Sequence, residues 1–460
     1  MATTLLSPFG RDLFVGDETK YGQVVREMRA SASWFLPTLD GHPFTHKPPL
    51  HFWLIDVLTL PLGVYSTWAF VLPSIFALLF LLWLVVSMSR QAGSPSASRL
   101  AAFVVGTSVM IWASAQTARM DVSFTAFLTL AAWMLFVFFE RAESRALLVS
   151  AFAFGVATLI KGPMAPVIGI VLFLFEWWRR RRLPRANYAP ALATMILIPL
   201  LWAVPAMILG GRAYTHEIIV KQTIGRAVST WVHQAPPWYY LGHLPGILFP
   251  WFILAVMAVI PPVAILIADH CATGARGVRI ANVAMLVIYA VIGAAGLFVS
   301  PAMIRAPEAP LVVRSDVRAF FAIFAAMAIV GLLLAMRRSW LPSTIAVGLV
   351  PLIAFSYAAL VLMPLANELA STRPLIASLE RQRVAPEEIA LYWCPYLWSR
   401  DMPRSLERVH YVDAESLRTS HPTLIATSRI HAVEIAPALA GYRRVDSLRM
   451  IGKWFDVYRR

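Results

Sequence analysis

The side chains best suited to moving a proton lie near the start of the chain. Asp17 and Glu18 are adjacent, and Tyr21 follows them at the beginning of an amphipathic stretch, residues 21–29. A carboxylate placed beside an attacking hydroxyl can accept its proton, so Asp17 is a candidate general base. Aspartate is also a favoured N-terminal cap, and Asp17 stands just before the amphipathic stretch. These residue types alone leave both roles open.

A second carboxylate, Asp121, stands at the start of a long apolar stretch, directly after Ala118, Arg119 and Met120. An ionised carboxylate beside a hydrocarbon region is costly unless it is paired or functional. Asp121 could therefore cap a helix, form an ion pair with Arg119, or help to orient a bound molecule. The sequence favours none of these roles over the others.

Three histidines close together in the sequence, His42, His46 and His51, could bind a metal ion. Pro43 interrupts this segment, and the spacing of the histidines does not match a defined set of metal ligands. We therefore predict no metal site and no other cofactor, with a divalent metal at these histidines as the alternative. Ordinary loop histidines account for the pattern.

Composition indicates that these side chains belong to an integral membrane protein. Of the 460 residues, 59% are hydrophobic and 14% are charged, which is too apolar for a soluble domain of this length. Several stretches reach about 18 apolar residues, enough for a helix to cross a membrane, and we predict about ten spans in a mainly α polytopic bundle. The predicted spans lie near residues 64–88, 100–118, 121–139, 147–160, 164–178, 189–209, 244–268, 281–300, 318–336 and 343–364.

Arginines orient the predicted bundle. The run Arg179 to Arg182 is expected to stay in the cytoplasm, because basic residues are enriched in cytoplasmic loops. Alternation of the spans then places Asp17 on the outer face, and we expect a further helix upstream of this start to carry it there. The predicted outer segments are residues 1–63, 119–121, 161–163, 210–243 and 365–460.

The C-terminal part of the chain differs from the rest. Its hydrophobic runs, residues 388–393, 424–427 and 454–458, have the length of strands and are separated by charged and proline-containing stretches. This pattern predicts a small soluble α/β domain. We therefore divide the chain into an outer-face catalytic loop with amphipathic juxtamembrane helices, a transmembrane bundle and a soluble extracytoplasmic domain, at residues 1–63, 64–364 and 365–460.

The net charge indicates which partners to expect, and the cysteine content indicates whether to expect a disulfide. The formal net charge is +15, and basic residues in a membrane protein more often face lipid headgroups than nucleic acid. We therefore predict membrane lipids as partners and no nucleic acid. The two cysteines, Cys271 and Cys394, fall on opposite sides of the membrane in the predicted topology, so we expect no disulfide.

Five motifs occur in an order that resembles a known family. They are Gly16-Asp17-Glu18-Thr19-Lys20-Tyr21 leading to Lys47-Pro48-Pro49, then Ala118-Arg119-Met120-Asp121, Lys161-Gly162-Pro163, Pro237-Trp238-Tyr239-Tyr240 and Phe249-Pro250-Trp251. In these motifs the chain resembles bacterial integral-membrane glycosyltransferases of the C superfamily (GT-C), of the aminoarabinose-transferase and protein O-mannosyltransferase type. That family commonly has glutamate before the Lys-Pro-Pro turn, where this chain has His46.

The resemblance implies transfer of a sugar from a polyprenyl phosphate. Phosphate is already a good leaving group, so the reaction needs a base for the acceptor hydroxyl but no acid, and direct displacement inverts the anomeric carbon. By resemblance Asp17 is the base and Asp121 has a supporting catalytic role. The implied residues for the carrier phosphate are Lys47, Arg119, Lys161 and Arg226. The implied substrate-binding residues are Glu18, Tyr21, His46, Tyr239 and Tyr240.

Basic and aromatic residues at a membrane surface also act as lipid anchors. Anchoring is therefore the alternative role for each of the basic and aromatic side chains named above. For the whole chain, the resemblance implies an undecaprenyl-phosphate donor and a lipid A, lipopolysaccharide, glycolipid or protein acceptor, on the periplasmic side of a bacterial inner membrane. The alternatives are a lipid or sugar transporter, a scaffolding membrane subunit and a catalytically inactive homologue. Polar residues gather at one face rather than at the bilayer centre, which favours the enzyme over a transporter.

Overall fold

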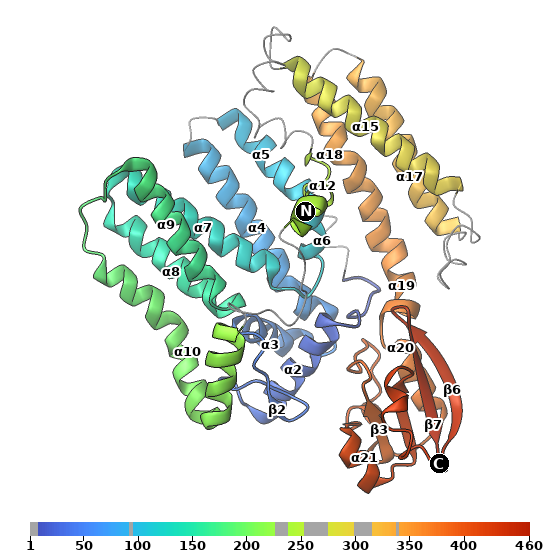
Figure 1. Cartoon of the computed structure of the whole chain (residues 1–460). Helices are drawn as coiled ribbons and strands as arrows, with labels where there is room; N and C mark the ends of the chain where they lie inside the picture. The colour runs from blue at the N-terminus through green and yellow to red at the C-terminus, as the bar shows by residue number, and fades with distance from the viewer. Residues whose placement is uncertain (1–7, 92–94, 226–237, 253–274, 299–314, 337–339) are drawn as a thin grey trace. The chain divides into compact units, whose positions relative to one another are not determined.

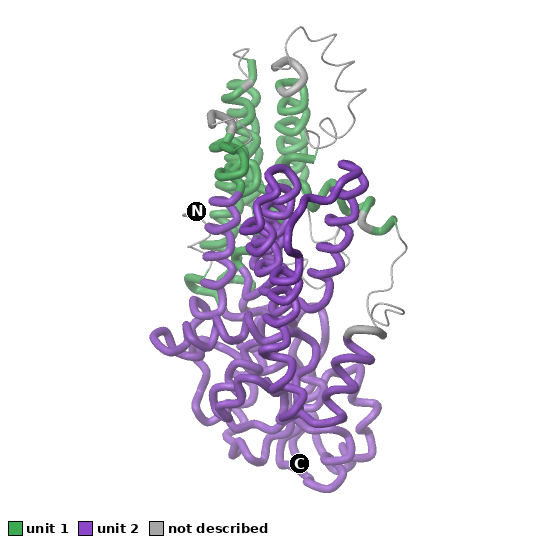
Figure 2. Tube along the Cα trace, turned by 90° about the vertical axis from the view of Figure 1, so that its left-hand side faces the viewer, with its two compact units in different colours: residues 1–11, 85–116, 235–366 green, residues 12–84, 117–234, 367–460 purple. Residues whose placement is uncertain are grey.

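The computed structural model describes residues 8–91, 95–225, 238–252, 275–298, 315–336 and 340–460 (Figure 1). The chain divides into two compact units, each built from segments that are far apart in sequence (Figure 2). The first unit comprises residues 1–11, 85–116 and 235–366, and the second comprises residues 12–84, 117–234 and 367–460.

Long apolar helices confirm the predicted membrane bundle. Among the described residues, seven helices are long and apolar enough to cross a membrane, and a bent pair would add an eighth. The helices of the second unit are α2 (Asp17–Ser31), α3 (Leu50–Leu62), α4 (Thr67–Gln91, entering the first unit at residue 85), α7 (Asp121–Arg141), α8 (Ser144–Lys161), α9 (Met164–Arg180), α10 (Ala189–His216) and η1 (Glu217–Gly225). The first unit holds α5 (Pro95–Thr107), α6 (Val109–Ala115), α12 (Tyr239–Ile247), α15 (Ala275–Phe298), α17 (Ser315–Ala335), α18 (Trp340–Tyr357) and η3 (Ala358–Leu362), followed by α19 (Met363–Ala370).

One predicted span is broken. The sequence predicts a continuous helix over residues 100–118, whereas α5 and α6 are bent by 68°. Ser108 adopts an extended conformation at the break. The hydroxyl groups of Thr107 and Ser108 donate to the carbonyl oxygens of Phe103 and Val104, at 2.7 and 2.9 Å. Such bonds to the preceding turn compete with regular helix continuation, and apolarity alone does not reveal them.

Glycines set the ends of other spans. Gly162, with φ of 90°, ends α8 at Lys161, as the break at Gly162-Pro163 predicts. Helix α10 continues past its predicted end and kinks at Gly211, where φ is 68°. The predicted span over residues 244–268 lies mostly outside the described residues, and α12 covers only its beginning.

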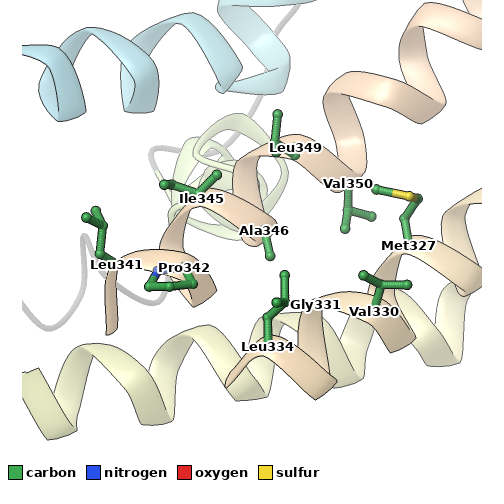
Figure 3. Close-up of a pocket in the computed structure, with 10 residues that line it drawn as sticks. All are labelled: Met327, Val330, Gly331, Leu334, Leu341, Pro342, Ile345, Ala346, Leu349 and Val350. Atoms are coloured by element: carbon green, nitrogen blue, oxygen red, sulfur yellow. The ribbon is translucent and has the colours of Figure 1, made fainter. Parts of the chain in front are cut away.

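The first unit holds an apolar pocket of about 260 Å³ between α17 and α18 (Figure 3). Its lining includes Met327, Val330 and Leu334 from α17, with Ile345 and Val350 from α18. Among the described residues, no ionisable side chain lines this pocket, so this lining can hold hydrocarbon and offers no group for proton transfer.

The predicted C-terminal α/β domain is present in the second unit. Its five-stranded sheet has the order β4-β3-β5-β7-β6, with β3 parallel to both β4 and β5, and β7 antiparallel to β5 and β6. The strands are β3 (Ile389–Tyr392), β4 (His410–Tyr411), β5 (Leu424–Ser428), β6 (Arg443–Met450) and β7 (Lys453–Arg459). The hydrophobic runs in the sequence predicted strands β3, β5 and β7, but they did not predict β4 or β6.

Alternation along the strands builds a core on each face of this sheet. Ile389 and Leu391 pack with Leu375 of α20 (Arg373–Arg381) on one face. Ala390 and Tyr392 pack on the other face with Leu417 of α21 (Ala414–Ser420). Because successive strand residues point to opposite faces, a buried run such as 389–392 supplies both cores.

Candidate active site

Asp17 opens helix α2 but does not cap it. The cap position is Gly16, whose φ of 122° favours glycine, and no side chain caps the helix. Asp17 and Glu18 occupy the first turn, where negative charge is stabilised by the helix dipole. The Asp17 carboxylate instead forms an ion pair with Arg119 at 3.3 Å, and its side chain is 46% exposed. It is therefore available to a ligand.

Buried Glu18 fixes the turn that carries Arg119. One of its carboxylate oxygens accepts from the backbone N–H of Ala118 at 2.6 Å, and the other accepts from that of Phe14 at 2.9 Å. Ser74 of α4 donates to the carbonyl oxygens of Thr117 and Arg119 as well. With only 5% of its surface exposed, Glu18 acts through the protein backbone and positions Arg119 beside Asp17.

Asp121 is the first residue of α7, and its direct partner is Lys161 at the end of α8, at 2.5 Å. The sequence offered Arg119 as the ion-pair partner, whereas Arg119 bonds to Asp17. The charges of Arg119 and Lys47 also act on Asp121. Two carboxylates and two basic groups therefore form a cluster at the starts of α2 and α7 and the end of α8, and Lys47, in the segment before α3, adds a third positive charge to it.

Tyr21 is buried close to this cluster. It is 3% exposed, and its ring contacts Phe52 and His51 edge to face, with centroids 5.2 and 6.1 Å apart. Burial raises the pKa of its hydroxyl, and the charges of Asp17 and Asp121 act in the same direction. Tyr21 therefore stays neutral, and its ring packs in the interior close to the two carboxylates.

A cavity of about 990 Å³ in the second unit adjoins Asp17. On one side it is lined by the N-terminal segment, including Asp17, His42 and His46. On the other side it is lined by the C-terminal domain, including Trp393 and His431. His46 is exposed, and its charge also acts on Glu217 of η1.

Sequence reasoning missed the hairpin that shapes this cavity. Strands β1 (Thr38–Leu39) and β2 (His42–Pro43) are joined by Asp40 and Gly41, both with positive φ. The Glu27 carboxylate accepts from the backbone N–H groups of Asp40 and Gly41, at 2.8 and 3.1 Å. An Asp-Gly pair between short extended runs is a known hairpin signal, so the sequence did contain a clue.

Asp40 itself faces the C-terminal domain and lines the cavity. It accepts a hydrogen bond from the Tyr396 hydroxyl at 2.8 Å, while its other carboxylate oxygen is buried and has no hydrogen-bond partner among the described residues. Burial raises the pKa of this carboxyl from 3.8 to about 6. No sequence pattern predicted this contact.

Other predicted residues are not among the described residues of the second unit. Tyr239 begins α12 in the first unit and packs against His243, with ring centroids 4.1 Å apart. The side chain of Tyr240 and the whole of Arg226 lie outside the described residues, as does Cys271. Within the described part of the chain, Cys394 has no disulfide partner.

The three candidate metal ligands do not converge in the described parts of the chain. There, no group of three or more histidine, cysteine, aspartate or glutamate side chains is arranged to hold a metal ion. His42 and His46 line the cavity, whereas His51 is fully buried against Tyr21 and Phe52. The two histidines that line the cavity do not make a complete set of protein ligands for a metal ion.

Comparison with known proteins agrees with the sequence motifs. The family model described as dolichyl-phosphate-mannose-protein mannosyltransferase matches residues 46–207. The undecaprenyl phosphate-alpha-4-amino-4-deoxy-L-arabinose arabinosyl transferases of Edwardsiella ictaluri and Erwinia tasmaniensis are both 28% identical to the chain, over 254 and 255 residues. These matches cover 53% and 52% of this chain and 45% of each relative. The chain thus spans about half the length of the curated relatives it matches.

Solved structures share the fold over nearly the whole chain. The crystal structure of ArnT from Cupriavidus metallidurans bound to undecaprenyl phosphate has a TM-score of 0.71 and 19% identity, covering 99% of this chain and 96% of that one. The apo form of the same protein has a TM-score of 0.70. The motifs, the family match and the shared fold together show that this chain resembles the C-superfamily integral-membrane glycosyltransferases of the aminoarabinose transferase type.

Proposed function

We propose that this protein is a glycosyltransferase that moves a sugar from a polyprenyl phosphate to an acceptor hydroxyl, with Asp17 as the general base. The observation that carries the proposal is the placement of Asp17. Its half-exposed carboxylate lines a large cavity and lies 3.3 Å from Arg119, at the edge of a cluster of basic groups. A base beside a phosphate-binding cluster is what displacement of a phosphate by a hydroxyl requires.

The reaction is a single displacement. The acceptor oxygen forms a bond to the anomeric carbon while its proton passes to the Asp17 carboxylate. The bond between the anomeric carbon and the phosphate oxygen breaks, and the polyprenyl phosphate leaves with the bonding electron pair. One carboxylate is sufficient, because the phosphate needs no protonation, and the product has the inverted anomeric configuration.

Arg119 is suited to receive the carrier phosphate. Its ion pair with Asp17 joins two half-exposed side chains, and such pairs contribute at most about 1 kcal/mol. A phosphate can therefore draw Arg119 away from Asp17 at little cost, which also frees the carboxylate as a base. Lys47 and Lys161 add positive charge nearby, and Asp121 holds Lys161 in place. The family resemblance adds Arg226 to this proposed group, and that residue lies outside the described residues.

We assign an undecaprenyl-phosphate sugar as the donor, and a lipid A, lipopolysaccharide, glycolipid or protein as the acceptor. The reaction is placed on the periplasmic face of a bacterial inner membrane. The names of the relatives and the ligand of the solved ArnT support undecaprenyl phosphate as the carrier. The arginine run at the end of α9 supports the orientation, since basic loops stay in the cytoplasm.

The test compares sugar transfer in membranes with equal amounts of wild type, Asp17→Asn and Asp401→Asn, and in membranes with an empty vector. Radiolabelled sugar is supplied on native lipid-linked donors. We expect Asp17→Asn to lower transfer about 10²- to 10⁴-fold, the usual contribution of a general base. Asp401 is the matched control, because it also pairs with an arginine, at 3.4 Å, but is 85% exposed and does not line the cavity.

Unchanged transfer by Asp17→Asn would remove Asp17 as the base and leave the class of reaction standing. Absence of transfer by the wild type with every donor pool would overturn the proposal, in favour of a transporter or of an inactive homologue. His46 stands where the family commonly has glutamate, and this substitution would be the first explanation for an inactive homologue.

A further inference from the structure

The topology of the C-terminal sheet creates a ligand-binding edge. From the central strand β3, the chain continues to β4 on one side and later to β5 on the other, and all three strands are parallel. Their carboxyl ends therefore lie at one edge, where neighbouring connections leave in opposite directions. In open α/β sheets, ligands bind in the crevice outside such a switch point.

The cavity that contains Asp17 lies at this edge. Its lining includes residues that directly follow each parallel strand: Trp393 after β3, Val412 and Asp413 after β4, and His431 shortly after β5. Asp17 lines the same cavity from the N-terminal segment. A molecule bound at the switch point therefore shares its space with the proposed base.

Trp393 is unusual for its backbone and for its exposure. Its φ is +49°, a left-handed conformation that costs a bulky side chain energy, and it is 62% exposed. A strained backbone that presents a large apolar ring to solvent contributes little to the fold. Strain of this kind concentrates at ligand sites.

The protein holds the Trp393 ring in a fixed orientation. The His431 ring stacks on it, with centroids 4.2 Å apart and planes 9° apart. Glu434 shares a hydrogen bond with His431 at 2.9 Å and accepts another from the Tyr392 hydroxyl at 2.7 Å. An aromatic ring fixed in this way loses little freedom when a ligand stacks on it.

We propose that Trp393, braced by His431 and Glu434, is the platform on which the saccharide of the acceptor binds. One face of a pyranose ring carries C–H groups and packs on an aromatic ring, while its hydroxyls need polar partners around the edge. Asp413, Ser428 and Lys453 line the same cavity and supply such partners. This inference rests on the proposed function, because it assigns the acceptor end of that reaction.

The geometry of displacement favours the acceptor over the donor at this platform. An inverting displacement brings the acceptor to the anomeric carbon from the side opposite the phosphate. Arg119, which would bind that phosphate, contacts Asp17 and is not part of the cavity lining. The cavity side of Asp17 is then the side from which an acceptor hydroxyl approaches.

The binding test uses saturation-transfer difference NMR with the full chain in lipid nanodiscs, so that no sugar detergent competes. The probes are the methyl glycosides of glucose, mannose and glucosamine. We expect saturation transfer to the C–H protons of at least one probe with the wild type, and a loss of about tenfold in Trp393→Gly. Glycine accepts positive φ, so the melting temperature of this variant stays equal to that of the wild type or rises.

Trp454→Ala is the matched control, because Trp454 is 42% exposed in the same domain but does not line the cavity. Its variant keeps the wild-type signals. The inference is overturned if no probe receives saturation from the wild type, or if the signals survive in Trp393→Gly.

Sugar transfer with the same variants separates this inference from the proposed function. We expect Trp393→Gly to need about tenfold more acceptor membrane for half-maximal rate, with an unchanged requirement for donor. The opposite pattern would place the donor sugar on Trp393 and overturn the assignment. Binding through Trp393 without any transfer by the wild type would refute the proposed function and leave the saccharide platform standing.

Discussion

The two walls of the cavity are built in different ways. The N-terminal wall comes from one short segment, whose backbone is held by the carboxylates of Glu18 and Glu27. The C-terminal wall comes from the ends of strands β3, β4 and β5, which only the sheet brings together. Asp17 and His46 of the first wall stand in or beside sequence motifs, whereas the hairpin of that wall and the whole of the second wall were missed. The groups proposed to do chemistry are encoded locally here, and the groups proposed to recognise the acceptor depend on topology.

The contacts between the walls also differ from the contacts within them. Asp12, just before the N-terminal wall, is fully buried and bonds to Arg373 at 2.5 Å and to Ser399 at 3.0 Å, both in the C-terminal part of the chain. Asp40 reaches Tyr396 across the cavity. Two carboxylates thus join the walls, and breaking each one separately tests whether the walls work independently.

Replacing Asp12 should have the largest effect on stability. Asp12→Ala leaves the Arg373 guanidinium and the Ser399 hydroxyl without their buried acceptor, which costs about 3 kcal/mol. Thermal unfolding followed by circular dichroism measures this loss, with Asp401→Ala as the control, since Asp401 is an exposed partner of the same arginine. Equal melting temperatures for the two variants would show that the Asp12 contacts do not hold the walls together.

Replacing Glu18 tests the N-terminal wall alone. Glu18→Ala leaves the backbone N–H groups of Phe14 and Ala118 without their acceptor, at a cost of about 2 kcal/mol, and releases the turn that positions Arg119. We expect the half-saturating donor concentration to rise about tenfold, with the half-saturating acceptor level unchanged, because Arg119 is the proposed partner of the donor phosphate. A change confined to the acceptor requirement would contradict the separation between the walls.

Glu18→Gln sharpens this result. Its amide oxygen can still accept from one N–H group, so its effects on stability and on donor binding should fall between those of the wild type and Glu18→Ala. An effect equal to that of Glu18→Ala would show that the charge of Glu18, rather than its hydrogen bonds, positions the turn.

Replacing Asp40 should have the smallest effect, and one that depends on pH. Because burial raises the pKa of this carboxyl to about 6, the folded chain binds the proton more tightly than the unfolded chain. The contribution of Asp40 to stability therefore falls as the pH rises from about 4 to 6 and is constant above that range. Asp40→Asn keeps an acceptor for Tyr396 and removes this titration.

We expect Asp40→Asn to melt at the same temperature as the wild type near pH 4.5 and about 2 °C higher at pH 7.5. Melting curves at several pH values check this. A difference that does not vary with pH would show that the Asp40 carboxyl does not titrate within this window.

Much of the fold could be predicted from the sequence, because the length of an apolar stretch is a local property. Apolar length gave the spans that became α4, α7, α8, α9, α10, α15, α17 and α18, and Gly162 marked the end of α8. The same reasoning missed the break at Ser108, where hydroxyl groups bond to the preceding turn inside a mostly apolar stretch.

The sequence by itself determined which residue types stand at the ends of the predicted helices, and its resemblance to a known family made Asp17, Arg119, Asp121 and Lys161 candidate site residues. Only the tertiary structure decided their pairing, Asp17 with Arg119 and Asp121 with Lys161, because partners 102 and 40 residues apart depend on how helices pack and rotate. The structure alone also placed Trp393 on the same cavity as Asp17. A side chain at a strand end acquires its neighbours from strand order, and strand order is set by the whole domain rather than by local sequence.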